Sequence, residues 1–386
     1  MKLCVCVAVS FAVWLAAGPA FAADDRAVVF AHMVNWHSNT SKENSIAEHT
    51  TETPCRTSLN PVGIPCDPGG ASLGYDSFDP AIIEAQNEDF LTYGITPLVS
   101  WWGQNARAGD AYLEQYLALP SPVQIGVLYE ATGLLVQESD GRFLFDASLN
   151  GIENRARFVR DIDHLQSTYF ANPEYTNRFF HMPGERPVLF VWVGALFGRG
   201  FETLSADLHA RIPIYFVGSG VSPYLPGSLA VDRGFAQAVR GFDAVSAYGN
   251  YVPELARKYN GHLSLPHVAE LLGGFSRWSK WLAEQAPGVK FWPPMMFSFK
   301  SKDIGANVPL TATEAEARDF SLAVRTYIEG AYARCTNVDP YVMFASWNEH
   351  YEGSSLEPTT EYRDTFAKAL VDTFKNGPPL PAGCRP

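Results

Sequence analysis

Short apolar runs alternate with longer amphipathic segments along most of this chain. Runs of about four to eight residues rich in β-branched and aromatic side chains predict buried strands, and apolar positions spaced three and four residues apart predict helices. The predicted strands are Ala27–Ala31, Thr96–Trp101, Gln124–Tyr129, Pro187–Val193, Ile212–Val217, Ala244–Ala247, Lys290–Phe297 and Tyr341–Ser346. The predicted helices are Pro80–Leu91, Ala111–Leu119, Gly151–Tyr169, Phe201–Ala210, Phe235–Arg240, His267–Gln285, Thr313–Ala333 and Thr360–Phe374.

This alternation of strands and helices predicts an α/β fold with a parallel sheet. Eight strands, each followed by a helix, is the count of a (β/α)8 TIM barrel. A segment rich in Gly, Pro, Ser and Thr follows the first strand, from about Ser38 to Phe78, and indicates long βα loops. An open doubly wound sheet is the alternative, but no glycine-rich dinucleotide-binding sequence follows the first strand.

The N-terminus has the pattern of a signal peptide. Lys2 precedes an apolar run from Leu3 to about Ala17, and Ala20 and Ala22 provide the small residues of a cleavage site. We expect residues 1–22 to be removed and residues 23–386 to form one barrel domain that is secreted or periplasmic. A retained anchor is the alternative, but the apolar run is shorter than the about 20 residues of a membrane-spanning helix.

Four cysteines remain after the expected cleavage, an even number that fits an oxidising compartment. They allow three pairings, of which the local one, Cys55–Cys66 with Cys335–Cys384, is the simplest. A zinc site is the competing interpretation. No C-x-x-C spacing occurs and no histidine pair lies near either group, so we expect no metal site.

Charge and composition limit the classes of binding partner that we expect. The chain has 29 basic and 41 acidic residues, a net charge of −12, and no basic cluster. We therefore expect no binding to nucleic acid or, after signal cleavage, to a membrane. Aromatic residues make up 13% of the chain, and such side chains stack on sugars but also fill large cores.

Polar and aromatic residues cluster where the predicted strands end, which is the side of a TIM barrel that carries the active site. The last strand leads into three carboxylates, Glu349, Glu352 and Glu357. A pair of carboxylates is the usual set of catalytic groups for cleaving a glycosidic bond. The other strand-end residues are His32, Trp36 and His37 after the first strand, Trp101 and Trp102 at the second, Glu130 at the third, Trp192 at the fourth and Tyr248 after the sixth.

The segment Ser346–Pro358, SWNEHYEGSSLEP, resembles the pattern S-[FW]-N-E-W-x-E-G-x-x-[IL]-E-P of glycoside hydrolase family 99. That family contains endo-α-mannosidases and endo-α-mannanases, and related GH99-like domains occur in bacterial polysaccharide loci. Weaker matches keep the family's order, so the resemblance spans roughly Val28 to Pro358. They are Phe30–His32 with Trp36, Val99–Gly103, Leu128–Glu130, Gly184–Val188 and Gly241–Asp243.

The resemblance implies a retaining hydrolase on a (β/α)8 barrel that needs no cofactor. Glu349 would be the base that assists the substrate's 2-hydroxyl in attacking the anomeric carbon, and Glu352 would be the acid/base. Asn348 would hydrogen-bond the sugar or orient Glu349, and Glu130 would bind sugar hydroxyls. The further substrate-binding residues would be His32, Trp36, Trp101, Trp102, Tyr248 and Glu357.

The chain also departs from the family pattern. His350 stands where the family has Trp, and Met33–Asn35 replaces a tyrosine-rich stretch. The residues that shape the subsites therefore differ, and an α-glucan is possible in place of a mannose-type polysaccharide. A non-catalytic or biosynthetic carbohydrate-binding protein of the GH99-like type is the second function class. The presence of both glutamates favours the enzyme.

Overall fold

The structure is a computed structural model, and it describes residues 26–35, 37, 76–104, 106–134, 136–137, 143–144, 152–192, 200–219, 238–300, 308–334, 336–350, 352–359 and 362–381. The expected signal peptide, Trp36 and the cysteines Cys55, Cys66, Cys335 and Cys384 lie outside these ranges. Both the cleavage and the disulfide pairing therefore remain predictions.

Parallel strands form the centre of the molecule, in the spatial order β9, β8, β7, β3, β2, β1 and β14. All neighbouring pairs in this series are parallel. The strands are β1 (Val28–Met33), β2 (Ile95–Trp101), β3 (Gly126–Tyr129), β7 (Arg186–Val191), β8 (Tyr215–Gly218), β9 (Ala244–Val245) and β14 (Tyr341–Phe344).

The segment Lys290–Met295 joins the two ends of this series and closes the barrel. Its first part, β10 (Lys290–Phe291), pairs with β9, and its second part, β11 (Pro294–Met295), pairs with β14. The N–H of Trp292 donates to Val245 O at 3.0 Å, and Pro293 O accepts from the N–H of Met343 at 3.1 Å. Pro293 and Pro294 lack an N–H, which explains why one strand is divided into two short pieces.

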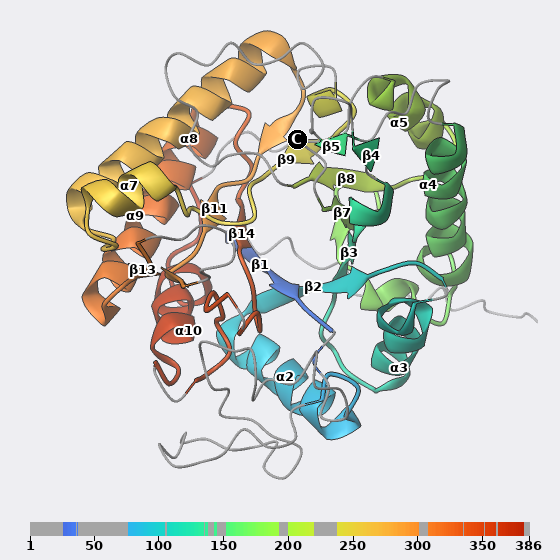
Figure 1. Cartoon of the computed structure of the whole chain (residues 1–386), viewed down its shortest axis with the longest axis horizontal. Coiled ribbons are helices and arrows are strands. Elements are labelled where there is room, and N and C mark those ends of the chain that lie inside the picture. The colour runs from blue at the N-terminus through green and yellow to red at the C-terminus, as the bar shows by residue number, and fades with distance from the viewer. Residues whose placement is uncertain are drawn as a thin grey trace, which may run out of the picture.

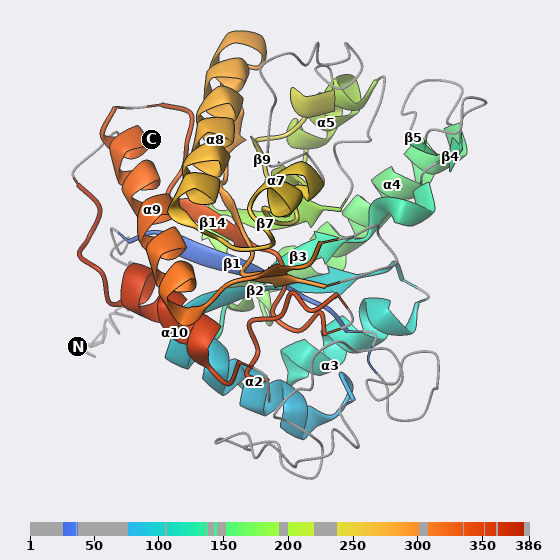
Figure 2. The ribbon, with the colours of Figure 1, turned by 60° about the vertical axis from the view of Figure 1, so that its left-hand side comes forward.

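Helices surround the strands on all sides (Figure 1). Viewed from the side, the strands run between α8 and α9 on one flank and α2 and α3 on the other (Figure 2). The helices are α2 (Pro80–Tyr93), α3 (Tyr112–Ala118), α4 (Ile152–Leu165), α5 (Phe201–His209), α7 (Pro253–Lys258), α8 (Leu265–Gln285), α9 (Glu314–Ala333) and α10 (Thr365–Leu370). The fold is thus the predicted α/β barrel with interleaved helices.

Local sequence signals account for several helix ends. Thr313 caps α9 with a capping box, in which its hydroxyl accepts from the N–H of Glu316 and the Glu316 carboxylate accepts from the N–H of Thr313. Asp79 caps the start of α2, and Gly94 ends it with a φ of 65°. The closing helix begins at Thr365 rather than at the predicted Thr360, because Thr359 and Arg363 pair with each other ahead of it.

Two cores follow from the alternation of side chains along the strands. Every second residue points into the barrel and forms an inner core that includes Phe30, Leu98, Leu128, Phe190 and Trp292. The residues between them point outward and pack under the helices, as Val29, Val99, Val127, Leu189 and Phe216 do. Because both faces of each strand are buried, the strands read as continuous apolar runs.

Short hairpins extend the loops that follow two of the strands. Strands β4 (Val136–Gln137) and β5 (Phe143–Leu144) form one hairpin after β3. Strands β12 (Ser298–Phe299) and β13 (Leu310–Thr311) form another after β11. A further short strand, β6 (His181–Met182), pairs antiparallel with β7. No helix within the described residues is long and apolar enough to span a membrane.

Candidate active site

The site begins one layer above the inner core, at the C-terminal ends of the strands. Two residues beyond an inward-facing core residue, each strand presents its next inward-facing side chain. By this spacing Phe30 is followed by His32, Leu98 by Ser100 and Leu128 by Glu130, while Phe190 is followed by Trp192. On β9 the series Ala244, Ser246, Tyr248 gives the same result. The layer therefore combines His32, Ser100, Glu130, Trp192 and Tyr248.

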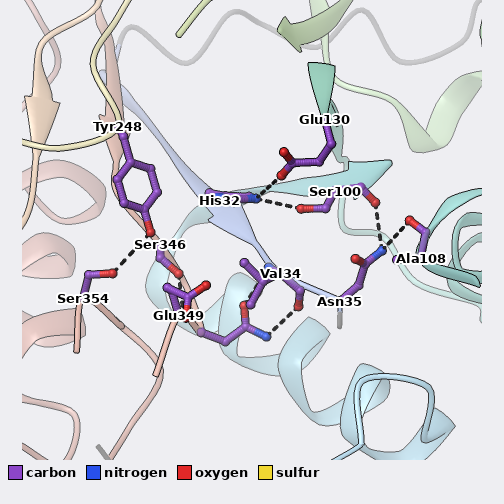
Figure 3. A network of polar contacts seen from close by, with 11 residues as sticks. His32, Val34, Asn35, Ser100, Ala108, Glu130, Tyr248, Ser346, Glu349 and Ser354 are labelled. Carbon is purple, nitrogen blue, oxygen red and sulfur yellow. Dashed lines mark hydrogen bonds and ion pairs between the residues drawn. The ribbon is translucent and has the colours of Figure 1, made fainter. Parts of the chain in front are cut away.

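His32 links the first three strands of the barrel (Figure 3). Its Nε2 atom is hydrogen-bonded to Ser100 Oγ at 2.7 Å and lies 3.7 Å from Glu130 Oε1. Burial lowers the pKa of His32 to about 3 and raises the pKa of Glu130 to about 8. At neutral pH the contact therefore joins a neutral imidazole and a largely protonated carboxyl, and it is not an ion pair.

The loop after β14 is fixed to β1 through Asn348. Its amide oxygen accepts from the N–H of Val34 at 2.8 Å, and its amide nitrogen donates to Val34 O at 2.9 Å. The ring of His37 hydrogen-bonds to Asn348 O at 2.9 Å, and the N–H of Glu349 donates to Ser346 Oγ at 2.6 Å. Of the two roles predicted for Asn348, this geometry supports orienting Glu349 rather than contacting a sugar.

Glu349 and Glu352 both lie against Tyr248. The two carboxylates raise the pKa of the Tyr248 hydroxyl, although burial of the ring is the larger cause. Burial raises the pKa of Glu352, and the hydrogen bond from Tyr248 acts in the opposite direction. The Tyr248 hydroxyl also lies 3.3 Å from Ser354 Oγ. A carboxyl with a raised pKa can hold the proton that a leaving oxygen needs.

Backbone contacts set the position of Glu352. The N–H of Lys300 donates to Glu352 O at 2.7 Å, and Ser298 Oγ donates to Gly353 O at 2.5 Å. Both donors belong to the segment that begins with β12, so the loop after β11 holds the loop after β14. The Oε2 atom of Glu352 is buried and accepts no hydrogen bond from the described residues.

The contact predicted between Glu357 and substrate remains a prediction, and the structure places this carboxylate in contact with two other side chains. Its side chain is fully buried, lies 3.0 Å from His350 Nε2, and accepts from Gln86 Nε2 at 3.2 Å. Gln86 belongs to α2, so this carboxylate joins the loop after β14 to the helix layer. His350, which departs from the family pattern, is thus the partner of Glu357.

The contact predicted between Trp101 and substrate also remains a prediction. Trp101 is fully buried in the outer core, where its Nε1 donates to Asp110 Oδ1 at 2.9 Å and its ring lies 5.5 Å from that of Tyr129. It points outward because Ser100, the preceding residue of β2, points inward. Trp102 is half-buried beyond the end of the strand.

Two members of the layer, Ser100 and Trp192, were not predicted as substrate-binding residues, although Trp192 was noted at the end of its strand. Trp192 is half-buried, and its ring meets that of Tyr248 edge to face at 4.9 Å and that of His32 at 5.8 Å. The signal for both was available, since each follows an inner-core residue of its strand by two positions. In the described part of the chain, no three His, Cys, Asp or Glu side chains are grouped as ligands for one metal ion.

Comparisons with known proteins agree with this geometry at the level of the fold. No family model matches the sequence, and no curated protein matches it. A solved structure described as a glycoside hydrolase-like protein is 15% identical, covers 90% of this chain and 94% of its own, and has a TM-score of 0.63. The GH99 endo-α-mannosidase from Bacteroides thetaiotaomicron, in complex with bis-tris-propane, is 14% identical with a TM-score of 0.55, covering 92% of this chain and 98% of its own. The fold is that of these glycoside hydrolases.

Proposed function

We propose that this protein is a secreted or periplasmic glycoside hydrolase that cleaves an α-linked mannose-type or related polysaccharide within the chain and with retention. Glu349 is the base that assists the substrate's 2-hydroxyl, and Glu352 is the acid/base. The observation that carries the proposal is the position of both carboxyls against Tyr248 at the C-terminal ends of the barrel strands. This is the end at which TIM-barrel enzymes carry their active sites.

The environments of the carboxyls support this division of roles. The Oε2 atom of Glu352 is buried and accepts no hydrogen bond from the described residues, and burial raises the pKa of this carboxyl, which favours its protonated form. Glu349 is held by the N–H contact to Ser346 and by the attachment of Asn348 to β1. A general base must be oriented before it can act, and this loop provides a rigid support. Sugar rings can stack on Trp192, Tyr248 and Trp102, which are half-buried.

The test is digestion of a panel of α-mannans, α-glucans and bacterial exopolysaccharides by the mature protein, with products identified by mass. We expect internal cleavage of at least one of them, and loss of that cleavage in Glu349→Gln. Glu284→Gln, which changes an exposed glutamate of α8, serves as the matched control and keeps full activity. Binding without cleavage across the panel would contradict the proposal and indicate the non-catalytic GH99-like class. N-terminal sequencing of the exported protein tests the compartment, with Ala23 as the expected first residue.

A further inference from the structure

Glu130 is a buried carboxyl to which none of the described residues donates a hydrogen bond. Its side chain is only 3% exposed, and its Oε1 atom lies 3.7 Å from His32 Nε2, which is already bonded to Ser100. Burial keeps His32 neutral, since its pKa falls to about 3, so the ring offers no charge. A buried carboxyl without a partner costs free energy, which a donor supplied by a ligand would recover.

Two more carboxyls act on Tyr248, the aromatic neighbour of His32. Glu349 and Glu352 lie against Tyr248, whose ring is 6.1 Å from that of His32, the neighbour of Glu130. Figure 3 shows His32 and Glu130 across from Tyr248 and Glu349. Burial is the only cause of the raised pKa of Glu130, and no lysine or arginine acts on that of Glu352. Among the described residues, no lysine or arginine therefore offsets the carboxyl of Glu130 or that of Glu352.

The spacing and the aromatic rings indicate what kind of cation would fit. These three carboxyls are not grouped closely enough to ligate a single metal ion. Trp192 and Tyr248 stand edge to face at 4.9 Å beside them, and both are half-buried. Aromatic faces attract organic cations, and such rings also stack on sugars. A sugar that carries an ammonium group satisfies both features.

We propose that the site recognises a polysaccharide containing free amino sugars, with the ammonium group of one sugar bound by Glu130 beside Trp192 and Tyr248. This inference rests on the proposed function. Assistance by Glu349 needs a 2-hydroxyl on the sugar that is attacked, so the amino group belongs to a neighbouring sugar of the chain. Glu130 then sets specificity and takes no part in bond cleavage.

The test is a binding measurement that does not depend on cleavage. Methyl α-glycosides of 2-amino-2-deoxyglucose, -galactose and -mannose are titrated calorimetrically into the mature protein, each beside its 2-hydroxyl and N-acetyl forms. At least one amino form should bind about tenfold or more tightly than its 2-hydroxyl and N-acetyl forms, which is the scale of a charge-assisted hydrogen bond. Glu130→Gln should abolish most of that preference, and Glu284→Gln should retain it.

Equal affinity within every series, or no binding in any, would overturn the inference. A preference that survives in Glu130→Gln would overturn it as well. If Glu130→Gln fails to fold, the affinities of the wild-type protein for the amino, 2-hydroxyl and N-acetyl forms still test the inference. Cleavage of neutral polysaccharides without any amino preference would reject this inference and leave the proposed function standing. A preference for the amino form without cleavage of any polysaccharide would support this inference and reject the proposed hydrolase function.

Discussion

His32 Nε2 and Ser100 Oγ lie 2.7 Å apart inside the barrel, whereas Trp101, the residue after Ser100, is buried on the outer face of the same strand. One step along β2 thus separates the site from the helix layer. Ser100 fixes the histidine that stands beside Glu130, and Trp101 anchors the strand to Asp110. The two neighbours should therefore respond differently to substitution.

Trp101→Phe should lower stability without affecting sugar binding. The substitution removes the hydrogen bond from Trp101 Nε1 to Asp110 and leaves a gap in a fully buried position. We expect a loss of about 1–3 kcal/mol in the free energy of unfolding, measured with urea. Trp102→Phe is the matched comparison, since Trp102 is half-buried at the next position, and it should weaken binding more than stability. Weaker sugar binding by Trp101→Phe at unchanged stability would support a contact between Trp101 and the substrate.

Glu130 should make the wild-type protein less stable as pH rises from about 4.5 to 8. Its pKa rises from an unfolded value of about 4.3 to about 8 in the folded state. The folded state therefore binds more protons in this window, and stability falls with pH by at most about 1.4 kcal/mol per pH unit. The lowered pKa of His32 acts with the opposite sign between about pH 3 and 6.5, so it does not oppose the effect of Glu130 above pH 6.5.

Glu130→Gln isolates this effect because it leaves His32 in place. Thermal or urea unfolding should be measured at several pH values. Between about pH 4.5 and 8, the free energy of unfolding of the variant should rise relative to that of the wild type, and the variant should be the more stable protein at the upper end. The difference should level off above pH 8, where the wild-type carboxyl is fully ionised. Parallel stability profiles of the two proteins would show that Glu130 ionises normally.

Glu357→Gln should disturb the loop that carries Glu349. The Glu357 carboxylate accepts from Gln86 Nε2 and contacts His350 Nε2, and the amide would turn a donor toward one of them. An unsatisfied buried group costs about 1–3 kcal/mol, which urea unfolding would measure. We also expect kcat to fall more than KM changes, because Glu357 holds the loop through Gln86 and His350. Unchanged stability with a raised KM would instead support direct contact with the sugar.

The sequence predicted the barrel because each strand is short, apolar and followed by a helical pattern. Lys290–Phe297 was predicted as one strand, and the structure has two short strands there, β10 and β11, because Pro293 and Pro294 lack an N–H. Helix ends were predicted best where a cap is present, as at Asp79 and Thr313. The start of the last helix shifted because a pairing between Thr359 and Arg363 precedes it.

The site was harder to predict than the fold, for two physical reasons. A strand buried on both faces shows no alternation of polar and apolar residues, so Trp101 could not be told from an inward-facing residue. Counting in twos from Leu98 would have corrected this. The loop after β14 has no period at all, and its fold depends on contacts to β1 and α2 that lie far away in sequence. The burial of Glu357 and the role of Asn348 follow from those contacts alone.

The roles proposed for Glu349 and Glu352 can be separated with substrates that differ in their leaving group. Glu352→Gln should lower the rate of cleavage about 10²–10⁴-fold on substrates whose leaving oxygen needs a proton. The rate should fall far less on glycosyl fluorides, which need no proton. Glu349→Gln should be inactive on both, because the unassisted 2-hydroxyl is a poor nucleophile. The raised pKa of Glu352 motivates this assignment, and initial rates on both substrate types measure it. Equal losses for Glu352→Gln on the two types would void its role as the acid, and full activity in either variant would move the chemistry to another carboxyl, with Glu130 the next to test.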